Sequence, residues 1–219
     1  MAKLRVHCFT ISVDGYGAGS EQTEAAPMGI GASGGRLHQW YFSTPFGAAM
    51  IGAEPPAGDG GIDQEFLEAG VENIGAHVMG RNMFGPVRGP WPDESWRGWW
   101  GETPPYGHDV FVLTHHERAD LAMDGGTTFH FWTAGLESAV EAAFIAAGGQ
   151  DVRLGGGVSV VQQAMKAKLV DSLHLTISPM LLGGGERLFD NLDDAWQGYS
   201  VASIVGGSSG VAHVTLVKT

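Results

Sequence analysis

Three stretches of the sequence could bind an anion, and each directly follows a short apolar run that predicts a buried strand. They are Gly80-Arg81-Asn82, Thr114-His115-His116 and Gly155-Gly156-Gly157. The last stretch leads through Val158 and Ser159 into apolar residues at helical spacing, namely Val161, Ala164, Met165 and Leu169. Unpaired amides and the dipole at such a helix start favour an anion, usually a phosphate. Tight packing can also require a glycine-rich turn, so this stretch alone leaves both interpretations open.

The three stretches together are stronger evidence for a ligand site than any one of them alone. In open α/β sheets, ligands bind beyond the carboxyl ends of the strands, where the following loops converge. A dinucleotide needs a helix start for its pyrophosphate and cationic loops for its adenosine end. We therefore expect a single dinucleotide site that uses all three stretches.

The hydrophobic pattern predicts the elements that would position these loops. Strands are expected at Leu4–Ser12, His77–Met79, Val110–Leu113, Thr127–Thr133, Val152–Leu154, Leu173–Ile177, Ser200–Val205 and Val211–Val217. Helices are expected at Asp63–Ile74 with Asp63 as the N-cap, at Leu136–Ala147, and after Gly157. This alternation predicts the α/β class, with a mostly parallel mixed sheet flanked by helices and a C-terminal antiparallel hairpin. We expect a single domain over residues 1–219.

Two long segments match no regular element, and long loops in compact domains are usually functional or mobile. Residues 17–61 are rich in Gly, Ala, Pro and Ser around the aromatic cluster Trp40-Tyr41-Phe42. Residues 86–107 combine prolines with Trp91, Trp96, Trp99 and Trp100. The second segment either covers a pocket or a partner subunit, or is held on the surface by its own rings.

The composition excludes several classes of partner. With 12 basic and 24 acidic residues the net charge is −12, which argues against nucleic acid. No apolar run approaches the ~20 residues of a membrane span, and the first residues lack a signal-peptide pattern. The single cysteine, Cys8, excludes an internal disulfide and indicates a reducing cytoplasm. The nine histidines lack metal-ligand spacing, so we expect no metal.

Several motifs, taken in order, resemble the dihydrofolate-reductase-like superfamily. The closer resemblance is to the reductase domain of the bifunctional riboflavin-biosynthesis deaminase-reductase. The motifs are Ser12-Val13-Asp14-Gly15, Met79-Gly80-Arg81, Val112-Leu113-Thr114, Leu154-Gly155-Gly156-Gly157 and the segment Pro179–Phe189, which together span most of the chain. The resemblance is to a stand-alone reductase domain, because one cysteine cannot supply the P-C-x-x-C zinc ligands of the deaminase.

The resemblance implies NADPH as the hydride donor. It places Gly80, Arg81 and Asn82 on the phosphates, Thr114, His115 and His116 beside the adenosine, and Gly155, Gly156, Gly157, Val158 and Ser159 on the pyrophosphate. It also implies a cis peptide within the glycine triplet. Met83 and Gly85 depart from the family pattern, which usually has a threonine and an acidic residue there. Histidines stand where a cation for the 2′-phosphate is usual, so we expect a modest NADPH preference that fades as the pH rises from 6 to 8.

For the substrate, hydride transfer to C=N or C=O needs a proton donor, or water, near the acceptor atom. In folate reductases an acid at a helix start has this role, and Asp63 lies near that place, with Glu65 as the neighbouring alternative. Asp14 would lie beside the nicotinamide. Asp63 could instead be an ordinary N-cap, and Asp14 an ordinary turn residue.

Other residues could shape the substrate pocket. Trp40 could stack on a flat substrate ring or pack its own loop, and Gly184 and Glu186 could border the substrate by analogy with the family. We therefore expect a cytoplasmic, homodimeric, NADPH-dependent reductase of a small heterocyclic (pteridine- or pyrimidine-like) or carbonyl substrate. The alternatives are a non-catalytic NADP(H)-binding protein, a riboflavin-pathway 5-amino-6-(5-phosphoribosylamino)uracil reductase and a dihydrofolate reductase. The riboflavin-pathway activity needs cations for a ribose phosphate, for which only Arg36 and Arg187 are candidates.

Overall fold

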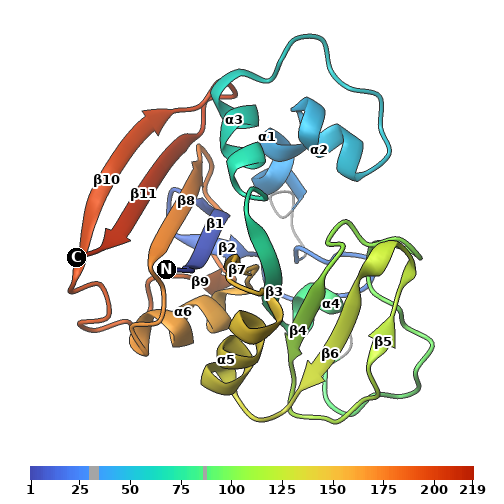
Figure 1. Cartoon of the computed structure of the whole chain (residues 1–219). Coiled ribbons are helices and arrows are strands. Elements are labelled where there is room, and N and C mark those ends of the chain that lie inside the picture. The colour runs from blue at the N-terminus through green and yellow to red at the C-terminus, as the bar shows by residue number, and fades with distance from the viewer. Residues whose placement is uncertain (30–34, 86–87) are drawn as a thin grey trace. The chain divides into compact units, whose positions relative to one another are not determined.

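The computed structural model describes residues 1–29, 35–85 and 88–219, and the chain forms two compact units (Figure 1). Unit 1 comprises Met1–Val6 and Asn73–Asp171, and unit 2 comprises His7–Glu72 and Ser172–Thr219. The first strand, β1 (Leu4–Ser12), gives its first three residues to unit 1 and the rest to unit 2. The single domain expected over residues 1–219 stays a prediction.

Unit 1 is built on parallel strands with one antiparallel edge strand (Figure 1). The strands lie in the order β1-β7-β3-β4-β6-β5, and all neighbours are parallel except β5 and β6. Their bounds are β3 (Ile74–Gly80), β4 (Asp109–Leu113), β5 (Leu121–Ala122), β6 (Thr128–Trp132) and β7 (Asp151–Leu154). The continuous apolar runs of β3 and β4 are buried, as expected for parallel strands covered on both faces.

Short helices follow these strands. α5 (Leu136–Ala146) contacts β3, β4 and β7 through a buried stripe at helical spacing, namely Leu136, Ala139, Val140 and Ala143. α6 (Val158–Lys166) follows β7 through the glycine triplet and contacts β3. α4 (Arg81–Phe84) begins directly after β3, where the sequence predicted only a loop, and the 3-10 turn η2 (Asp124–Gly126) precedes β6. The loops that follow β3 and β7 are therefore both helix starts.

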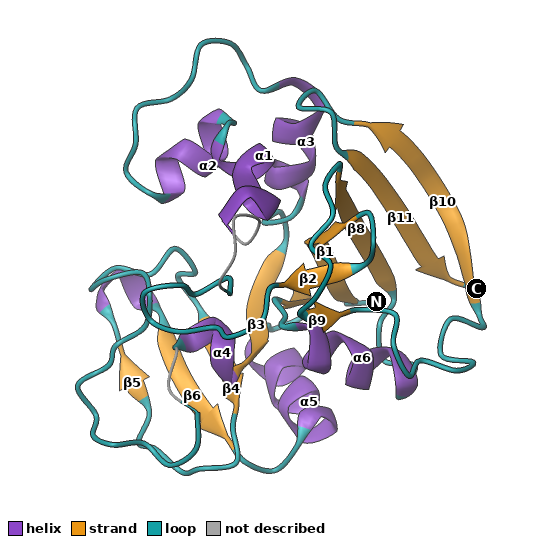
Figure 2. Ribbon diagram, turned by 180° about the vertical axis from the view of Figure 1, so that it is seen from behind, coloured by secondary structure: helices purple, strands orange, loops and turns teal. Residues whose placement is uncertain are grey.

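The tryptophan-rich segment has no helix or strand between Arg88 and His108 and runs as a loop (Figure 2). Trp91, Trp96 and Trp100 pack against a buried cluster that includes Phe84 and Phe129. The segment is therefore held in place by its own rings, and its covering of a pocket or a partner subunit stays a prediction. Its first two residues, 86 and 87, lie outside the described residues.

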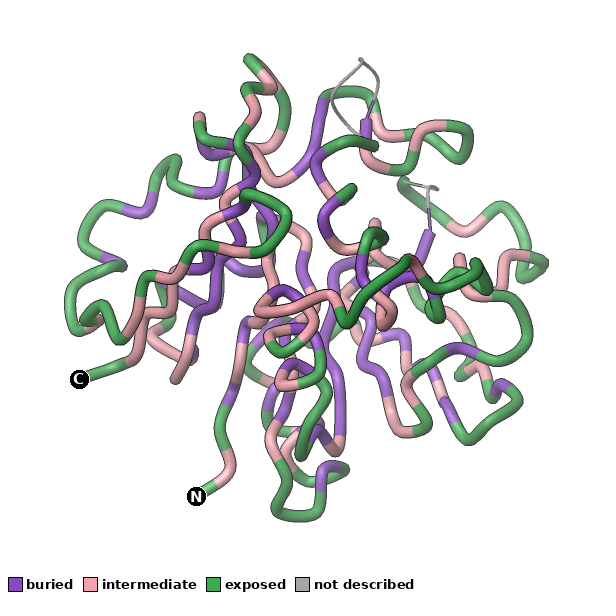
Figure 3. Tube along the Cα trace, turned by 90° about the horizontal axis from the view of Figure 1, so that it is seen from above, coloured by how far each residue is buried: buried purple, intermediate pink, exposed green. Residues whose placement is uncertain are grey.

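Unit 2 combines antiparallel strands with short helices. Its strand order is β10-β11-β8-β1, with β11 antiparallel to both of its neighbours. The strands are β8 (Ser172–Ser178), β10 (Tyr199–Gly206) and β11 (Ala212–Lys218), with a separate pair formed by β2 (Tyr16–Ala18) and β9 (Glu186–Arg187). The helices are η1 (Gly35–His38), α1 (Gln39–Phe42), α2 (Pro45–Met50) and α3 (Gly61–Ala69). β8 is mostly buried and β10 mostly exposed, and Figure 3 colours the chain by this burial.

α3 corrects two of the predictions made from the sequence. The N-cap is Gly60, whose φ of 74° is left-handed, so Asp63 is not the N-cap but lies in the first turn with its side chain buried. The helix ends at Ala69 rather than Ile74, because Ile74 starts β3 and pairs with Asp151.

One more segment differs from the prediction. The described part of residues 17–61 contains η1, α1 and α2, most of β2 and the first residue of α3, instead of one short element, and residues 30–34 lie outside the described residues. The glycine-rich segment Pro179–Phe189 forms only the two residues of β9.

The predicted fold class is confirmed. The chain is α/β, with a mostly parallel mixed sheet flanked by helices and a C-terminal antiparallel hairpin formed by β10 and β11. Within the described part of the chain, no helix has the length and apolar character needed to cross a membrane.

Candidate functional site

The glycine turn of unit 1 presents backbone amides that have no acceptor. Gly157 is the N-cap of α6, and no side chain caps this helix. The Gly157 carbonyl accepts the amides of Val160 and Val161 at 3.1 and 3.2 Å, which closes the first helical turn. Across the described ranges, the amides of Gly157, Val158 and Ser159 have no hydrogen-bond acceptor. Such amides are the groups that bind an anion at a helix start.

The end of β3 closes against this turn. The Gly80 amide donates to the Gly156 carbonyl at 2.6 Å. A Cβ at Gly80 would lie 2.9 Å from Val160 Cγ2 and 3.4 Å from the Gly157 nitrogen, so a side chain there would fill the space beside the free amides. The Gly156–Gly157 peptide is cis, as the resemblance implied. Glycine at position 80 therefore keeps open a cradle of backbone groups.

The Arg81 guanidinium is engaged by the end of β4 and by the tryptophan-rich segment. Its Nη1 donates to Thr114 Oγ1 at 3.1 Å and to the Gly89 carbonyl at 3.0 Å. Its Cζ lies 3.2 Å from the centroid of the Trp91 ring, while Nε and Nη2 are buried and have no hydrogen-bond partner among the described residues. Burial, and secondarily the charge of Arg118, lowers the pKa of Arg81 to about 10. Arg81 thus stays a cation at neutral pH.

The loop after β4 gathers around the same ring. Thr114 Oγ1 also accepts the His116 amide at 3.2 Å, and the Trp91 indole N–H donates to the His116 carbonyl at 3.1 Å. His115 is exposed, and Asn82 is partly buried in α4. Two of the three predicted stretches, those after β3 and β4, are therefore brought together around Trp91.

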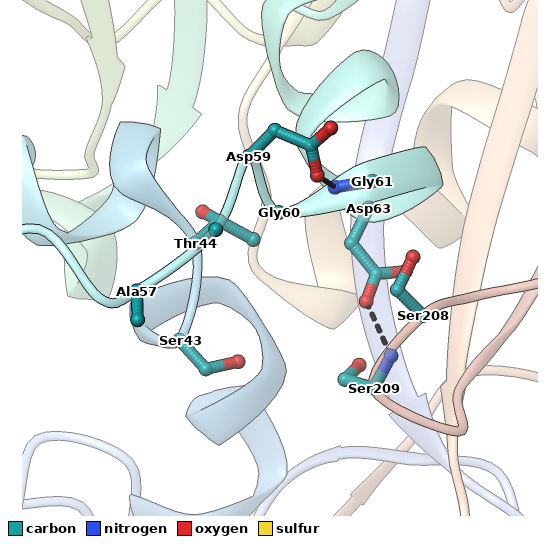
Figure 4. A pocket seen from close by; sticks show the side chains of 10 residues that line it. Ser43, Thr44, Ala57, Asp59, Gly60, Gly61, Asp63, Ser208 and Ser209 are labelled. Carbon is teal, nitrogen blue, oxygen red and sulfur yellow. Dashed lines mark hydrogen bonds between the residues drawn. The ribbon is translucent and has the colours of Figure 1, made fainter.

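Unit 2 holds a separate polar hollow next to the start of α3 (Figure 4). It is lined by Ser43, Thr44, Ala57, Gly58, Asp59, Gly60, Gly61, Asp63, Ser208 and Ser209. The Asp63 side chain is only 1% exposed, and its Oδ2 accepts the Ser209 amide at 2.8 Å. Asp59 lines the same hollow but accepts only the amide of Gly61, at 3.0 Å.

The other oxygen of Asp63 faces a buried pair of histidines. Oδ1 lies 2.8 Å from His213 Nε2, and His213 Nδ1 lies 3.1 Å from His174 Nε2. Both rings are fully buried and both stack on the Phe66 ring, at 4.2 and 4.5 Å between centroids. Asp63 therefore anchors a hydrogen-bonded chain that runs from the hollow into the core of unit 2.

Trp40 lies in a second hollow of unit 2. That hollow is lined by Arg36, Gln39, Trp40, Ser43, Ser178, Pro179, Met180, Ser209 and Val211. The Trp40 indole N–H donates to Thr10 Oγ1 at 3.0 Å, and its ring meets His213 edge to face. Since Trp40 is only 4% exposed, it forms a wall of the hollow rather than an exposed stacking platform. Ser43 and Ser209 line both hollows.

The remaining predicted substrate and catalytic residues lie apart from these hollows. Glu65 is exposed on α3, and Glu186 pairs with Ala18 in β9, next to the partly exposed Gly184. Asp14 accepts the Ser12 hydroxyl at 2.5 Å and the amides of Gly183 and Leu182 at 2.8 and 3.1 Å. The Ser12 hydrogen bond, followed by the two amides, lowers the pKa of Asp14 to about 2 against the effect of burial.

The prediction from the sequence did not include the residues that form hydrogen bonds with Asp63 or continue its hydrogen-bonded chain. His174 and His213 lie on strands 39 residues apart, and His213 lies 150 residues from Asp63. Ser208 and Ser209 belong to the turn between β10 and β11, where the sequence predicts a hairpin and no site. One available signal was the alternation in β8, which puts His174 and Thr176 on one face of a strand that is buried.

The comparisons with known proteins agree with this geometry. The family model for the RibD C-terminal domain matches residues 5–200. The chain belongs to the family of RibD C-terminal domains. This confirms the resemblance seen in the sequence, including its dihydrofolate-reductase-like fold, and supports a reductase role for this family member.

Two solved structures share the fold of this RibD C-terminal domain. The first is a riboflavin biosynthesis protein from Shewanella sp. PV-4, with 22% identity, a TM-score of 0.59, and coverage of 100% of this chain and 99% of that one. The second is a pyrimidine reductase-like protein from Corynebacterium diphtheriae, with 16% identity, a TM-score of 0.55, and coverage of 100% and 92%. No match was found among the curated proteins.

Proposed function

We propose that this protein is an NADPH-dependent reductase that transfers a hydride to a small heterocyclic or carbonyl substrate. The observation that carries the proposal is the set of amides without acceptors at Gly157, Val158 and Ser159, beside the space that Gly80 leaves open. Membership of the RibD C-terminal domain family supports the same reaction class.

The residues of unit 1 fit a dinucleotide cofactor. Free amides at the start of a nine-residue helix match the pyrophosphate, and a Cβ at Gly80 would crowd them. Arg81 and Asn82 would serve the phosphates, and Thr114, His115 and His116 the adenosine. When bound, the nicotinamide supplies the hydride. In this arrangement the backbone amides of the chain would hold and orient the cofactor.

Unit 2 supplies the groups suited to a substrate. The hollow at the start of α3 is lined mainly by small polar residues and by two carboxylates, Asp59 and Asp63. Such a lining favours a ligand with several N–H or O–H donors over an apolar one. We assign this hollow, and the adjoining one walled by Trp40, to the substrate.

A proline at position 158 tests the cofactor site. Val158 is the first residue of α6, where proline is tolerated because its missing N–H is not needed by the helix. The extended Gly157 before it is also compatible with a following proline. Val158→Pro therefore removes one amide and leaves the helix intact. We expect NADPH to bind ~10-fold or more weakly, since hydrogen bonds to charged groups contribute about 1.5–3 kcal/mol.

Val158→Ala is the matched control, because it keeps the amide and removes only side-chain atoms. Binding is measured by titration calorimetry on both variants, and folding by circular dichroism. Equal NADPH affinity in the two variants would remove the glycine turn from the cofactor site. NADPH binding without oxidation on any pteridine, pyrimidine or carbonyl compound would favour the alternative of a binding protein without turnover.

We also propose a homodimer in the cytoplasm. β10 is the edge strand of unit 2, and it exposes Val201 and Ile204, at 57% and 69%. An edge strand with exposed apolar residues favours pairing with a second chain. Light scattering of Ile204→Lys and of the unchanged protein tests this, with a monomeric variant as the expected result. A chain with one cysteine, Cys8, suits a reducing compartment.

A further inference from the structure

The strongest unexplained feature of the molecule is the buried chain that connects Asp63 to the backbone of Cys8. The links are Asp63 Oδ1 to His213 Nε2 at 2.8 Å, His213 Nδ1 to His174 Nε2 at 3.1 Å, and His174 Nδ1 to the Cys8 amide at 3.1 Å. All three side chains are 1% exposed or less. Every link is contained in unit 2.

The Cys8 amide fixes where the protons lie in this chain. A backbone amide can only donate, so His174 Nδ1 is an acceptor and its proton must sit on Nε2. His174 Nε2 then donates to His213 Nδ1, which must be an acceptor in turn. A neutral His213 therefore carries its proton on Nε2 and donates it to Asp63.

The same accounting excludes a proton on Asp63 Oδ1. If that oxygen donated to His213 Nε2, one of the two rings would have both nitrogens as acceptors and would be an imidazolate. A doubly protonated His213 would instead turn its Nδ1–H toward the Nε2–H of His174. An ionised Asp63 with two neutral Nε2–H histidines satisfies all three links.

The second oxygen of Asp63 also accepts a hydrogen bond, which supports the ionised state of its carboxylate. Oδ2 accepts the Ser209 amide at 2.8 Å, so both oxygens receive a proton donor from the protein. The backbone at Gly207 packs closely against this pair, because a Cβ there would lie 2.1 Å from Asp63 Oδ1 and 3.0 Å from His213 Nε2. Buried carboxylates need such donors to stay charged.

From this we propose that His213 and His174 are positioning residues that hold Asp63 as an ionised hydrogen-bond acceptor on the wall of the hollow. Resting on the proposed reductase function, this means that Asp63 receives a hydrogen bond from a substrate N–H or O–H group. It does not give up a proton.

The first test reads the proton positions directly in the unchanged protein. Long-range ¹H–¹⁵N spectra at pH 7 separate protonated from unprotonated imidazole nitrogens, and the ¹³Cγ shift of Asp63 separates carboxylate from carboxylic acid. We expect Nε2–H on both His174 and His213, and a carboxylate at Asp63. A proton on Nδ1 of either ring, or on Asp63, would overturn the proposal.

The second test asks whether His213 acts through Asp63. His213→Leu removes the donor, and we expect the Asp63 ¹³Cγ resonance to move toward the acid value at pH 7. His213→Gln keeps an N–H at the Nε2 position, and we expect it to restore the carboxylate resonance. An unchanged resonance in a folded His213→Leu protein, or no recovery in His213→Gln, would contradict the positioning role.

His108→Asn is the matched control, since it alters the hydrogen-bonded pair of His77 and the half-buried His108, which lies in unit 1. It should leave the Asp63 resonance in place, and a shift there would point to a general loss of packing and against the proposal. None of these measurements needs a cofactor. Their failure is therefore distinct from failure of the reductase function, which the Val158→Pro titration tests in unit 1.

Discussion

Each unit of this protein contains a pair of hydrogen-bonded histidines, and the two pairs end differently. In unit 1, His77 Nδ1 lies 2.6 Å from His108 Nε2, and the rings are stacked at 4.8 Å. In unit 2, His174 and His213 are joined at 3.1 Å, and this pair continues to Asp63. The side chains are the same, so the difference lies in what surrounds them.

The charged groups next to each histidine pair differ, and they affect whether the pair stays neutral. Burial, then the charge of Arg153 and then His108, lowers the pKa of His77 well below its usual value. Burial also lowers the pKa of His108, although the neighbouring Asp109 raises it. The unit 1 pair, with His77 buried and His108 half-buried, is thus neutral, whereas the unit 2 pair is completed by a carboxylate. A buried histidine pair becomes a candidate for function when one end reaches a charged group at a pocket.

The largest effect should come from removing the donor to Asp63. His213→Leu leaves a buried carboxylate without its partner, and we expect a loss of about 3 kcal/mol in the free energy of unfolding, as for hydrogen bonds to charged groups. His77→Leu in unit 1 should lose only about 1 kcal/mol, because no charge is left uncompensated there. Urea denaturation measures both values.

His213→Gln serves as the control for this pair of variants, since it retains a donor. It should recover most of the stability that His213→Leu loses. Equal losses from His213→Leu and His77→Leu would show that the two pairs are energetically alike.

A smaller loss is expected from Gly207→Ala. The new Cβ would lie 2.1 Å from Asp63 Oδ1 and 2.6 Å from Val211 Cγ2, so the turn or the carboxylate must move. Overpacking of this kind costs about 1–3 kcal/mol. Gly80→Ala in unit 1 meets a single side-chain methyl, Val160 Cγ2 at 2.9 Å, rather than a charged oxygen, and should cost less.

Thermal unfolding of the two glycine variants compares these costs, and NADPH titration of Gly80→Ala separates stability from cofactor binding. A Gly207→Ala protein as stable as the unchanged one would mean that the Asp63 corner is loosely packed. That result would also weaken the assignment of Asp63 as a rigidly held acceptor.

The sequence was sufficient for most of the fold because hydrophobic periodicity is local information. The strands at Leu4–Ser12 and Val110–Leu113 and the helix from Leu136 emerge as expected. α4 was missed because its four residues are shorter than any periodic pattern can reveal. The N-cap at Gly60 was missed because its left-handed φ, rather than a side-chain oxygen, starts α3.

The candidate site was only partly accessible to the same reasoning. Gly80 and the Gly155–Ser159 turn could be found because Gly80 ends one strand and the turn directly follows another, and a sheet brings adjacent strand ends together. Asp63 could be singled out only through the resemblance. Its partner His213 could not be found at all, because a single residue on a distant strand leaves no local pattern.

Acidification should destabilise the protein through the unit 1 pair. The pKa of folded His77 lies below the unfolded value of 6.5, so the unfolded chain takes up a proton first. Stability is complete above pH ~6.5 and falls below it, by at most about 1.4 kcal/mol per pH unit for this one group. His77→Asn keeps a polar group at the Nδ1 position and should flatten this fall in urea denaturation from pH 7 to 5.

Part of the acid sensitivity should survive in His77→Asn. Burial lowers the pKa of His38 to about 4, and this residue titrates in the same direction. An unchanged pH dependence in the variant would mean that His77 is protonated in the folded protein. The contrast between a neutral pair and a carboxylate-linked pair would then be lost.

The smallest effect is expected at Asp14, a carboxylate that has donors but neither a histidine pair nor deep burial. It accepts the Ser12 hydroxyl and the amides of Leu182 and Gly183, and its pKa is lowered to about 2. Asp14→Ala should leave the melting temperature nearly unchanged at pH 7, since exposed substitutions contribute little. Amide exchange at Leu182 and Gly183 should nevertheless become faster.

In the unchanged protein, Asp14 protects these two amides from exchange above pH ~3.9, and the protection is lost as the pH falls toward 2. A loss of melting temperature in Asp14→Ala as large as that in Gly207→Ala would contradict this ranking. Backbone donors alone would then stabilise a carboxylate as much as the burial and the histidine pair stabilise Asp63.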